Sequence, residues 1–510
     1  MSWNAGYITD VDYTFGYYMD FNPSRIAFAL ATVGLTAPTI RNACELGFGQ
    51  GLSTAIHAAA QPGIQWWGTD FNPSQAGFAQ DLVAESGSSA KLYDQAFAEF
   101  CARDDLPEFE FIVLHGIWSW VSDENHAIIV DFLRRKLAVG GVVYISYNTL
   151  PGWSAAAPLR HLLKQHSDVK AAPSVKRTQR IDEAFGFLDQ LMATKPVYML
   201  AYPALSERYE KLKGQDRHYL AHEYMNHDWR PMYFSELAER LEPAKLSYAG
   251  SALLLEQQDA INLTPDQIKI VAGQTDPVFR ETLRDFITAQ QFRRDLWMRG
   301  PRPNTGLEQA EMLRKFRFLL TTPRADVPLT VKGQQGDVAL HEGVYRPLLD
   351  FLADHKIRSF AEIETAGQGA GISLPQVASA VAILVGAGHL SIVQDDKAIA
   401  KARPATEKLN SVLVHKSRSR WEIGFLASPV TGGGITVDRF EQLLLAARAQ
   451  GRKTPEEWAR GAYEILAAQG QQLSKNGRTL TTAEENIAEI ASRAEQLERR
   501  LPILRALGVA

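Results

Sequence analysis

The stretch ACELGFGQGLSTA, residues 43–55, places three glycines between an apolar segment and a segment with helical spacing. Glycine adopts left-handed backbone conformations and lets a ligand approach the main chain, so Gly47, Gly49 and Gly51 predict a tight ligand-holding turn. The helix that follows has unpaired N–H donors at its start. The G-x-G-x-G spacing differs from the G-x-G-x-x-G of dinucleotide-binding proteins, which favours a nucleotide-type ligand other than NAD. A plain turn is the alternative.

Strand-like and helix-like segments alternate through the first 150 residues. Strands are predicted at 39–46, 63–70, 90–97, 109–116 and 140–150, and helices at 51–60, 72–85 and 123–137. This alternation predicts right-handed βαβ units and a mostly parallel sheet, whose ligands bind at the carboxyl ends of the strands. The glycine loop, Asp70, Asp94, His115 and Asn148 all fall at such ends.

The composition describes a globular protein of enzyme size. The 510 residues are 45% hydrophobic and 22% charged, with a net charge of −4 and two cysteines, Cys44 and Cys101. A negative net charge does not attract the protein to nucleic acid. Two cysteines without disulfide or metal spacing are typical of a reducing compartment. The first residues lack the pattern of a secretory signal, and no apolar run approaches a membrane span. We therefore expect a cytoplasmic protein that binds neither membrane nor nucleic acid.

The rest of the chain divides into further segments. Residues 155–230 have a helical pattern, and strand-like patterns return at 244–256 and 291–300 on either side of a helix at 276–290. The expected domains are the first part of an α/β core (1–165), a helical insertion (166–231), the last strands of the core (232–300), a linker (301–334), a winged-helix-like domain (335–400) and a helical C-terminal domain (401–510).

The winged-helix-like order of helix, turn, helix and hairpin occurs within residues 336–394. Its second helix, SLPQVASAVAILVGAG (373–388), contains no Lys or Arg and so cannot neutralise phosphates. We therefore expect this region to dock a polypeptide or a second copy of the chain, which would make a homodimer, rather than DNA.

Two carboxyl groups flank the glycine loop. Asp70 ends the second predicted strand, where a carboxylate suits the two hydroxyls of a ribose. A helix cap is the alternative for Asp70, because Asn72 and Pro73 follow it. Glu45 precedes the first glycine by two residues and suits a cationic or amine-bearing ligand better than a pyrophosphate.

ELGFGQG (45–51) and GTDFNPSQ (68–75) resemble motifs I and II of class I S-adenosylmethionine-dependent methyltransferases. The resemblance implies an α/β, Rossmann-like sheet of seven strands, S-adenosylmethionine as cofactor, Glu45 near its methionine amino group, Asp70 on its ribose and Phe71 against its adenine. In that family the third strand ends in an acidic residue that reads the adenine amine, and Asp94 of YDQAF (93–97) lies one or two residues early for this role. The expected cofactor-binding residues are Glu45, Gly47, Phe48, Gly49, Gly51, Asp70, Phe71, Gln95, Ala96, His115 and Gly116.

Further stretches narrow the resemblance to methyltransferases that carry a methyltransferase regulatory domain. They are FIVLHGIWSWVSDENH (111–126), YISYNTLPGW (144–153), HYLAHEYMNHDWRPMYFSELAERL (218–241) and FRRDLWMRG (292–300). The whole order resembles that of the outer-membrane-protein lysine methyltransferases, and FLASPVTGGGITVDRF (425–440) is similar to their carboxyl-terminal part. Some members of this broad group resemble enzymes that N-methylate side chains of ribosomally made peptides.

Methyl transfer requires an aligned nucleophile and the removal of a proton, and a lysine with a pKa of about 10.4 must first become neutral. The catalytic candidates are His115 and Trp118 after the fourth strand, Tyr147 and Asn148 at the end of the fifth, and Tyr13 in the aromatic segment 10–26. Each has a structural alternative, as a histidine bonded to backbone, a core aromatic, a turn residue or a packing arm.

No metal site is expected, because His222 and His227 are five residues apart instead of the four of a helical zinc pair.

Taken together, the motifs and the resemblance predict a methyltransferase that modifies a side-chain nitrogen, of lysine or an amide, in a protein or peptide. Two alternatives stay open: an O- or N-methyltransferase of a sugar or small metabolite, and a non-catalytic cofactor-binding regulator with a winged-helix interaction module.

Overall fold

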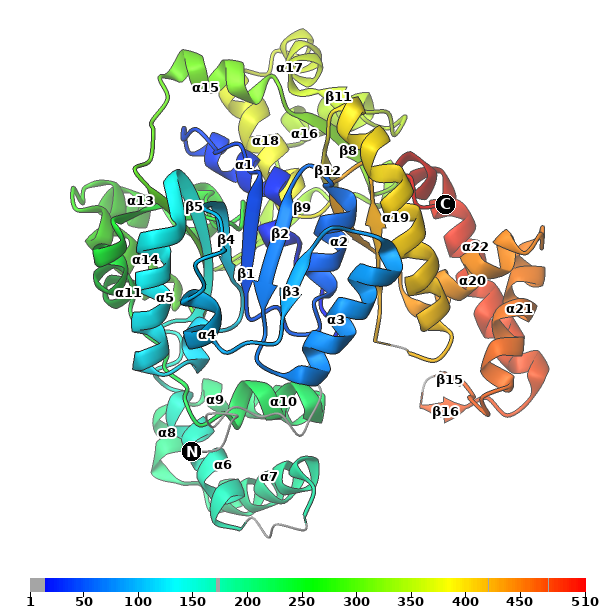
Figure 1. Ribbon diagram of the computed structural model, residues 1–510, viewed down its shortest axis with the longest axis horizontal. Coiled ribbons are helices and arrows are strands. Elements are labelled where there is room, and N and C mark those ends of the chain that lie inside the picture. Colours follow the sequence, from blue (N-terminus) through cyan, green and yellow to red (C-terminus); the bar gives the residue numbers. More distant parts are fainter. Residues whose placement is uncertain (1–13, 171–174, 421, 476) are drawn as a thin grey trace.

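A seven-stranded sheet lies at the centre of the computed structural model, which describes residues 14–170, 175–420, 422–475 and 477–510 (Figure 1). The strands are β1 (Asn42–Leu46), β2 (Gln65–Thr69), β3 (Lys91–Tyr93), β4 (Phe109–Leu114), β5 (Leu137–Asn148), β6 (Leu246–Ser251) and β7 (Phe292–Arg299). Their order is β3-β2-β1-β4-β5-β7-β6, and β7 is antiparallel to both of its neighbours. The α/β class and the seven-stranded sheet predicted from the sequence are confirmed.

Both faces of the sheet are buried, and the alternation of side chains along each strand decides which core each residue joins. In β5, Val142 and Tyr144 join the core that contains Trp66. Val143, Ile145 and Tyr147 join the opposite core, which contains Trp118, Phe132 and Phe234. This parity controls which strand residues can reach a ligand.

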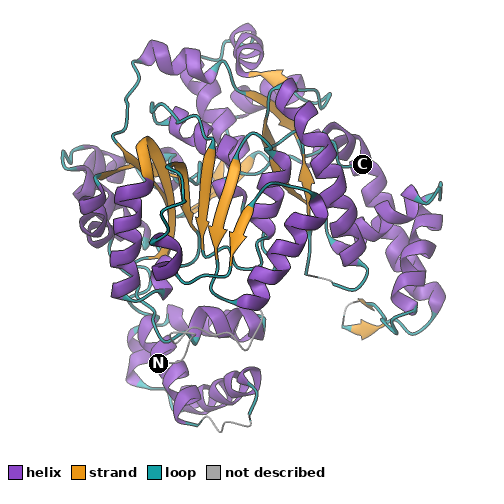
Figure 2. Cartoon of the chain, viewed as in Figure 1, coloured by secondary structure: helices purple, strands orange, loops and turns teal. Residues whose placement is uncertain are grey.

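Helices cover the two faces (Figure 2). On one side are α4 (Phe97–Cys101), α5 (Asp123–Lys136), the 3-10 helices η2 (Trp118–Trp120) and η3 (Glu242–Ala244), and α11 (Phe234–Leu241). On the other are η1 (Met19–Phe21), α1 (Pro23–Thr32) and α2 (Leu52–Ala60), with α3 (Pro73–Ser86) beside α2. Beyond the β6 edge lie α12 (Asp259–Asn262), α13 (Pro265–Ala272) and α14 (Pro277–Thr288).

A separate group of helices follows β5. It comprises α6 (Ala157–Val169), α7 (Arg177–Ala193), α8 (Val197–Ala201), α9 (Ala204–Lys213) and α10 (Arg217–Tyr224). These helices have their own core, in which Leu163, Ile181 and Leu220 are buried. In Figures 1 and 2 they lie below the sheet, at the end toward which the central strand arrows point. The group therefore lies beside the carboxyl ends of the strands.

The segment expected to be winged-helix-like contains the expected helices, with a different strand pairing. Its elements are β10 (Gly336–Ala339), α16 (Glu342–Phe351), β11 (Arg358–Ser359), α17 (Phe360–Gly369), α18 (Leu374–Gly386) and β12 (Leu390–Val393). The stretch before it, expected to be a linker, contains α15 (Gly306–Leu313), β8 (Arg317–Leu320), η4 (Arg324–Asp326) and β9 (Thr330–Gly333). The sequence predicts a hairpin after α18, but β12 pairs with β8 from that preceding stretch, and a long helix follows β12.

The C-terminal part is mainly helical, and it packs on the flank of the sheet domain. It consists of α19 (Asp396–Ser417), β13 (Phe425–Ser428), β14 (Gly433–Thr436), α20 (Arg439–Ala449), α21 (Pro455–Ala467), β15 (Ser474–Lys475), β16 (Arg478–Thr479) and α22 (Ala483–Ala506). Here α19 contacts α2 and α3, and Leu409 and Leu413 share a core with Leu52.

Among the described residues, the helices all fall short of the length and apolar character that a membrane crossing demands.

Candidate functional site

The glycine loop joins β1 to α2, and its backbone conformation requires glycine. Gly47, Gly49 and Gly51 have φ of 76°, 55° and 65°, in the left-handed region. A Cβ on Gly47 would lie 2.5 Å from Cγ2 of Ile117, and one on Gly51 would collide with Ala79. Other residues at these positions would therefore strain the turn and close the space above it.

Asp70 follows β2 and holds the loop from the next strand. Its Oδ2 accepts a hydrogen bond from the Gly49 N–H at 2.8 Å, and its Oδ1 accepts one from the Asn72 N–H at 3.0 Å. Burial raises the pKa of Asp70 to about 7, although both hydrogen bonds oppose the shift. A buried carboxylate at this place is costly unless further donors reach it.

Glu45 lies in β1 directly under the loop and is 3% exposed. Its carboxyl group accepts a hydrogen bond from the Thr54 hydroxyl of α2. Burial raises the pKa of Glu45 to about 8, and the negative charge of Asp70 adds to the shift. Ionised Glu45 would be strongly stabilised by a positively charged group of a ligand.

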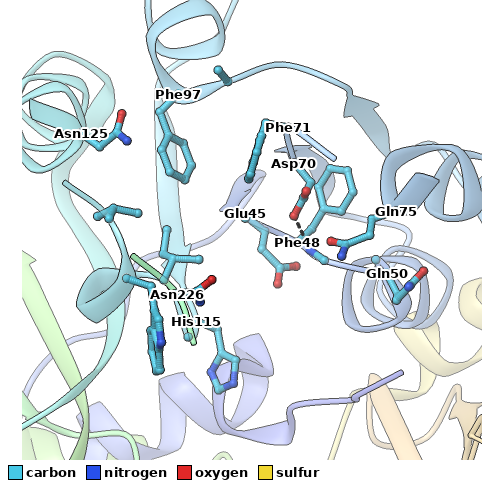
Figure 3. A pocket seen from close by; sticks show the side chains of 18 of the residues that line it. Glu45, Phe48, Gln50, Asp70, Phe71, Gln75, Phe97, His115, Asn125 and Asn226 are labelled. Atoms are coloured by element: carbon cyan, nitrogen blue, oxygen red, sulfur yellow. Dashed lines mark hydrogen bonds between the residues drawn. The ribbon is translucent and has the colours of Figure 1, made fainter. Parts of the chain in front are cut away.

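Three further side chains line the pocket: Gln75 and Phe71 are near Asp70 in the close view, and Phe97 is beyond Phe71 (Figure 3). Gln75, in the first turn of α3, is 2% exposed, and its Nε2 has no hydrogen-bond partner among the described residues. The rings of Phe71 and Phe97 project into the same part of the pocket, after β2 and at the start of α4. An unpaired amide donor beside a buried carboxylate is suited to a ligand with hydroxyl groups, and two aromatic rings are suited to a flat heterocycle.

His115 directly follows β4 and lies at the other end of the pocket. Its Nδ1 lies 3.0 Å from the Tyr144 hydroxyl and 3.4 Å from Oγ of Ser146, and its ring centroid lies 3.7 Å from that of Tyr18. Burial lowers the pKa of His115 to about 3, and the positive charge of Arg294 acts in the same direction. The imidazole is therefore neutral at physiological pH and a weak proton acceptor.

These residues line one pocket at the carboxyl ends of β1, β2 and β4. The residues that the sequence places in the cofactor site and that line it are Glu45, Gly47, Phe48, Gly49, Gly51, Asp70, Phe71, Gln95, Ala96, His115 and Gly116. Asp94 is exposed and lies outside the pocket lining.

Of the four catalytic candidates that the structure describes, His115 alone is in this lining. Trp118 is fully buried, and its Nε1 donates to Sδ of Met232 at 3.3 Å. Tyr147 is fully buried on the opposite face of β5 and donates to Asp295 at 2.8 Å. Asn148 accepts a hydrogen bond from Trp153 Nε1 at 2.9 Å. Tyr13 lies outside the described residues.

Several lining residues were missed from the sequence. They are Thr14, Gly16, Tyr18, Gln50, Leu52, Gln75, Phe97, Ala98, Ile117, Val121, Ser122, Asn125, Asn226 and Asp228. Gln75 had a usable signal, because it lies in the first turn of the helix after Asp70. Asn226 and Asp228 lie in the stretch 218–241 that carries the resemblance, but no pattern placed them at the pocket, since they follow α10, almost 80 residues after β5.

The described residues contain no group of three or more His, Cys, Asp or Glu side chains arranged to hold a metal ion. His222 is 2% exposed, whereas His227 is an exposed side chain next to Asp228.

Comparison with known proteins places this geometry in a class. Residues 216–299 match the family model described as a predicted methyltransferase regulatory domain. The fold is similar to PKMT2 from Rickettsia typhi in complex with AdoHcy, with a TM-score of 0.71 and 17% identity over 97% of this chain and 100% of that one. A second PKMT2 structure from the same organism gives a TM-score of 0.68 and 19% identity over 98% of this chain and 99% of the other.

The sheet order and the glycine loop are those of the class I methyltransferase fold, and residues 216–299 match the model of a methyltransferase regulatory domain. Within this class, the chain is 38% identical over 515 residues to the uncharacterized protein sll1526 of Synechocystis, covering 100% of both chains. The chain belongs to the family of that protein. It is also 26% identical over 292 residues to the uncharacterized protein RP789 of Rickettsia prowazekii, covering 56% of this chain and 51% of the other.

Proposed function

We propose that this protein transfers a methyl group from S-adenosylmethionine to a side-chain nitrogen, of lysine or an amide, in a protein or peptide. The observation that carries the proposal is the position of Glu45 and Asp70. They are two buried carboxyl groups with raised pKa values, and they lie on either side of an open glycine loop. In their ionised forms such groups are suited to a ligand that has both a positive charge and hydroxyl groups, and S-adenosylmethionine has an ammonium group, a sulfonium and a ribose.

The pocket residues divide along the length of that cofactor. Glu45 pairs with the amino group of the methionine part, and the glycine loop lies beneath it. Asp70 accepts from the ribose hydroxyls, and Gln75 donates to a ribose oxygen through its unpaired Nε2. Phe71 and Phe97 hold the adenine between apolar faces. His115 contacts the cofactor as a neutral ring.

When bound, the cofactor supplies a methyl group activated on a positively charged sulfur. The chain must then present a neutral amine to it. Tyr18, whose ring contacts that of His115, and Trp120 line the pocket and are largely shielded from water. An apolar, aromatic wall disfavours an ammonium ion relative to the neutral amine, which lowers the pKa of an entering lysine. His115, with a pKa of about 3, is not the group that keeps the released proton.

The segment after α10, which forms part of the pocket wall, favours a polypeptide substrate. Asn226 and Asp228 reach it from the segment after α10, so the helical group of α6–α10 adjoins the site. The similarity to PKMT2, whose abbreviation denotes a protein lysine methyltransferase, extends over 97% of this chain and includes the helical and C-terminal parts. A methyltransferase of small metabolites would not need these parts.

The direct test incubates the purified protein with S-adenosylmethionine and lysine-containing polypeptides and measures their masses. We expect a gain of about 14 Da, mapped by fragmentation to a side-chain nitrogen. Methylation of sugars or small metabolites alone would support the alternative enzyme, and cofactor binding without any methyl transfer would support the regulator.

Cofactor binding should depend on pH. Below pH 8 the Glu45 carboxyl of the free protein carries a proton, which must leave when an ammonium group pairs with it. Because the ligand selects the ionised form, we expect affinity for S-adenosylhomocysteine (AdoHcy) to fall as pH is lowered from 8 to 6, by up to about tenfold per unit for each linked group. Calorimetry across this range measures the slope. The same affinity at both pH values would contradict the assignment of Glu45.

The winged-helix-like segment should not bind DNA. Helix α18 contains neither Lys nor Arg, so it lacks the charge that phosphates require. We expect no salt-sensitive binding of the full-length protein to duplex DNA by fluorescence anisotropy. Clear binding at physiological salt would revive the regulator alternative.

A further inference from the structure

A second cavity, of about 480 Å³, lies beyond the β6 edge of the sheet, and among the described residues it shares no lining residue with the pocket described above. Its walls come from β6, β7, the loop after β6 and helices α12–α14, all within the segment that matches the regulatory domain, together with Val33, Leu35 and Gln334. Its charged lining residues are Glu256, Asp259, Arg280, Glu281, Arg284, Asp285 and Arg293.

Every nitrogen of the Arg293 guanidinium group already donates a hydrogen bond to a neighbour. Its Nε donates to Asp295 at 2.8 Å, and its Nη1 donates to Asp285 at 2.5 Å. Its Nη2 donates to the Tyr248 hydroxyl and to Glu281, each at 3.0 Å. An anion entering the cavity would therefore have to compete with these partners for every nitrogen of this side chain.

Arg284 is occupied in the same way. Its Nη1 pairs with Asp259, its Nη2 donates to the Glu256 carbonyl oxygen at 3.2 Å, and its Nε lies 3.8 Å from Glu281. Arg280 is the remaining cation among the described lining residues, and its side chain is exposed to solvent.

Two of the carboxyl groups, Glu256 and Asp285, are less well satisfied than the guanidinium groups. Glu256 accepts hydrogen bonds only from neutral donors, the Ser251 hydroxyl at 2.7 Å and the Gln290 amide at 3.0 Å, among the described residues. Asp285 is 3% exposed, and its Oδ2 has no hydrogen-bond partner within the described chain. Burial raises the pKa of Asp285 to about 7, which is the cost of a carboxylate that lacks a full set of partners.

The charged groups around the cavity favour a positively charged ligand. Around the cavity, five carboxyl groups, with Asp295 behind the lining, face the two engaged guanidinium groups and exposed Arg280. An added positive group would pair with Glu256 and relieve the repulsion between these carboxylates, whereas an added anion would increase it.

The remaining walls are apolar, which limits the rest of the ligand. Val33, Leu35, Leu263 and Val271 line the cavity beside the charged groups. A volume of this size accommodates a small ligand and its water. We propose that this cavity is a second binding site, which takes an alkylammonium group with its positive end at Glu256 and Asp285 and its carbon chain on the apolar wall. The occupant is a free alkylamine or a lysine side chain of a polypeptide.

The test titrates the full-length protein by calorimetry with two probes, 1,5-diaminopentane and Nα-acetyl-lysine N-methylamide. Glu256→Gln removes the charge and keeps the hydrogen-bond shape, and we expect it to weaken binding at least tenfold. Ala272→Trp places a bulky ring at an exposed wall residue without changing charge, and we expect it to abolish binding. Binding of the diamine alone identifies a free alkylamine, and binding of the lysine derivative identifies a polypeptide side chain.

Glu498→Gln is the matched control, because it removes one exposed carboxylate from α22, far along the chain, and should leave both titrations unchanged. Circular dichroism checks that each variant folds, and if Glu256→Gln does not fold, Ala272→Trp decides the result. The site would be overturned if millimolar probe did not bind to the wild-type protein, or if binding were unchanged in the folded variants.

The titrations are repeated with saturating AdoHcy. Failure of AdoHcy to bind would count against the proposed function and leave the amine result standing.

Discussion

Replacing Asp70 with alanine is expected to weaken AdoHcy binding by at least about 100-fold, beyond the range of calorimetry. The carboxylate is the proposed acceptor for the ribose hydroxyls, and hydrogen bonds to charged groups contribute about 1.5–3 kcal/mol each. The same side chain also accepts from the Gly49 N–H at 2.8 Å, so its removal loosens the glycine loop. Both losses reduce affinity in the same direction.

Asp94→Ala is the matched control for this experiment. Asp94 follows the neighbouring strand β3, is exposed and does not line the pocket. We expect its variant to bind AdoHcy as the wild-type protein does. Unchanged affinity in a folded Asp70→Ala variant would refute the assignment of the second motif, and a large loss in Asp94→Ala would move the ribose or adenine contact to β3.

Replacing Glu45 with glutamine should change the affinity for AdoHcy and the stability of the fold in opposite directions. Glutamine keeps an acceptor for the Thr54 hydroxyl but cannot pair with an ammonium group. We expect AdoHcy affinity to fall about 10- to 100-fold, and its dependence on pH between 6 and 8 to become smaller. Calorimetry at pH 6 and 8 measures both effects. Wild-type affinity in this variant would remove Glu45 from the site.

The same variant is expected to raise the free energy of unfolding. The pKa of Glu45 is raised to about 8 in the folded protein, whereas a free Glu has a pKa of about 4.3. The contribution of Glu45 to the free energy of unfolding is therefore fully present below about pH 4.3, where the carboxyl group is protonated in both states. It is lost as the pH rises to 8. The advantage of Glu45→Gln should grow over this window, by at most about 1.4 kcal/mol per pH unit, because the side chain is buried. Thermal unfolding at pH 5.5 and 8 checks the sign, and a Tm lower than wild type at pH 8 would contradict it.

The sequence predicted the strands and the loop because their signals are local. Buried strands of a parallel sheet are short apolar runs, and in this chain each of the first, second and fourth ends at a polar or glycine-rich turn. Since parallel strands have their carboxyl ends at one edge, the order of the strands along the chain is enough to group Glu45, Asp70 and His115. In the folded protein all three line one pocket.

The orientation of single side chains was harder to predict. Tyr147 and Ser146 are adjacent in β5, yet Ser146 accepts from the Gly116 N–H at the pocket while Tyr147 points to the opposite face and bonds Asp295. Strand parity sets this difference, and a run of residues buried on both faces gives no amphipathic pattern from which to read the parity. Trp118 is similar, because an aromatic residue after a strand can join a pocket or a core, and here it joins the core with Phe132.

Local sequence thus determined the fold class, the position of the glycine bend and the two carboxyl groups beside it, because these depend on periodicity and on residues close together in the chain. Tertiary structure alone decided which distant residues complete the pocket. Tyr18 reaches His115 from the N-terminal segment, and Asn226 and Asp228 arrive from beyond a helical insertion. The pairing of β12 with β8 was decided in the same way. Such contacts form between segments far apart in sequence, where packing of whole elements, rather than any short pattern, selects the neighbour.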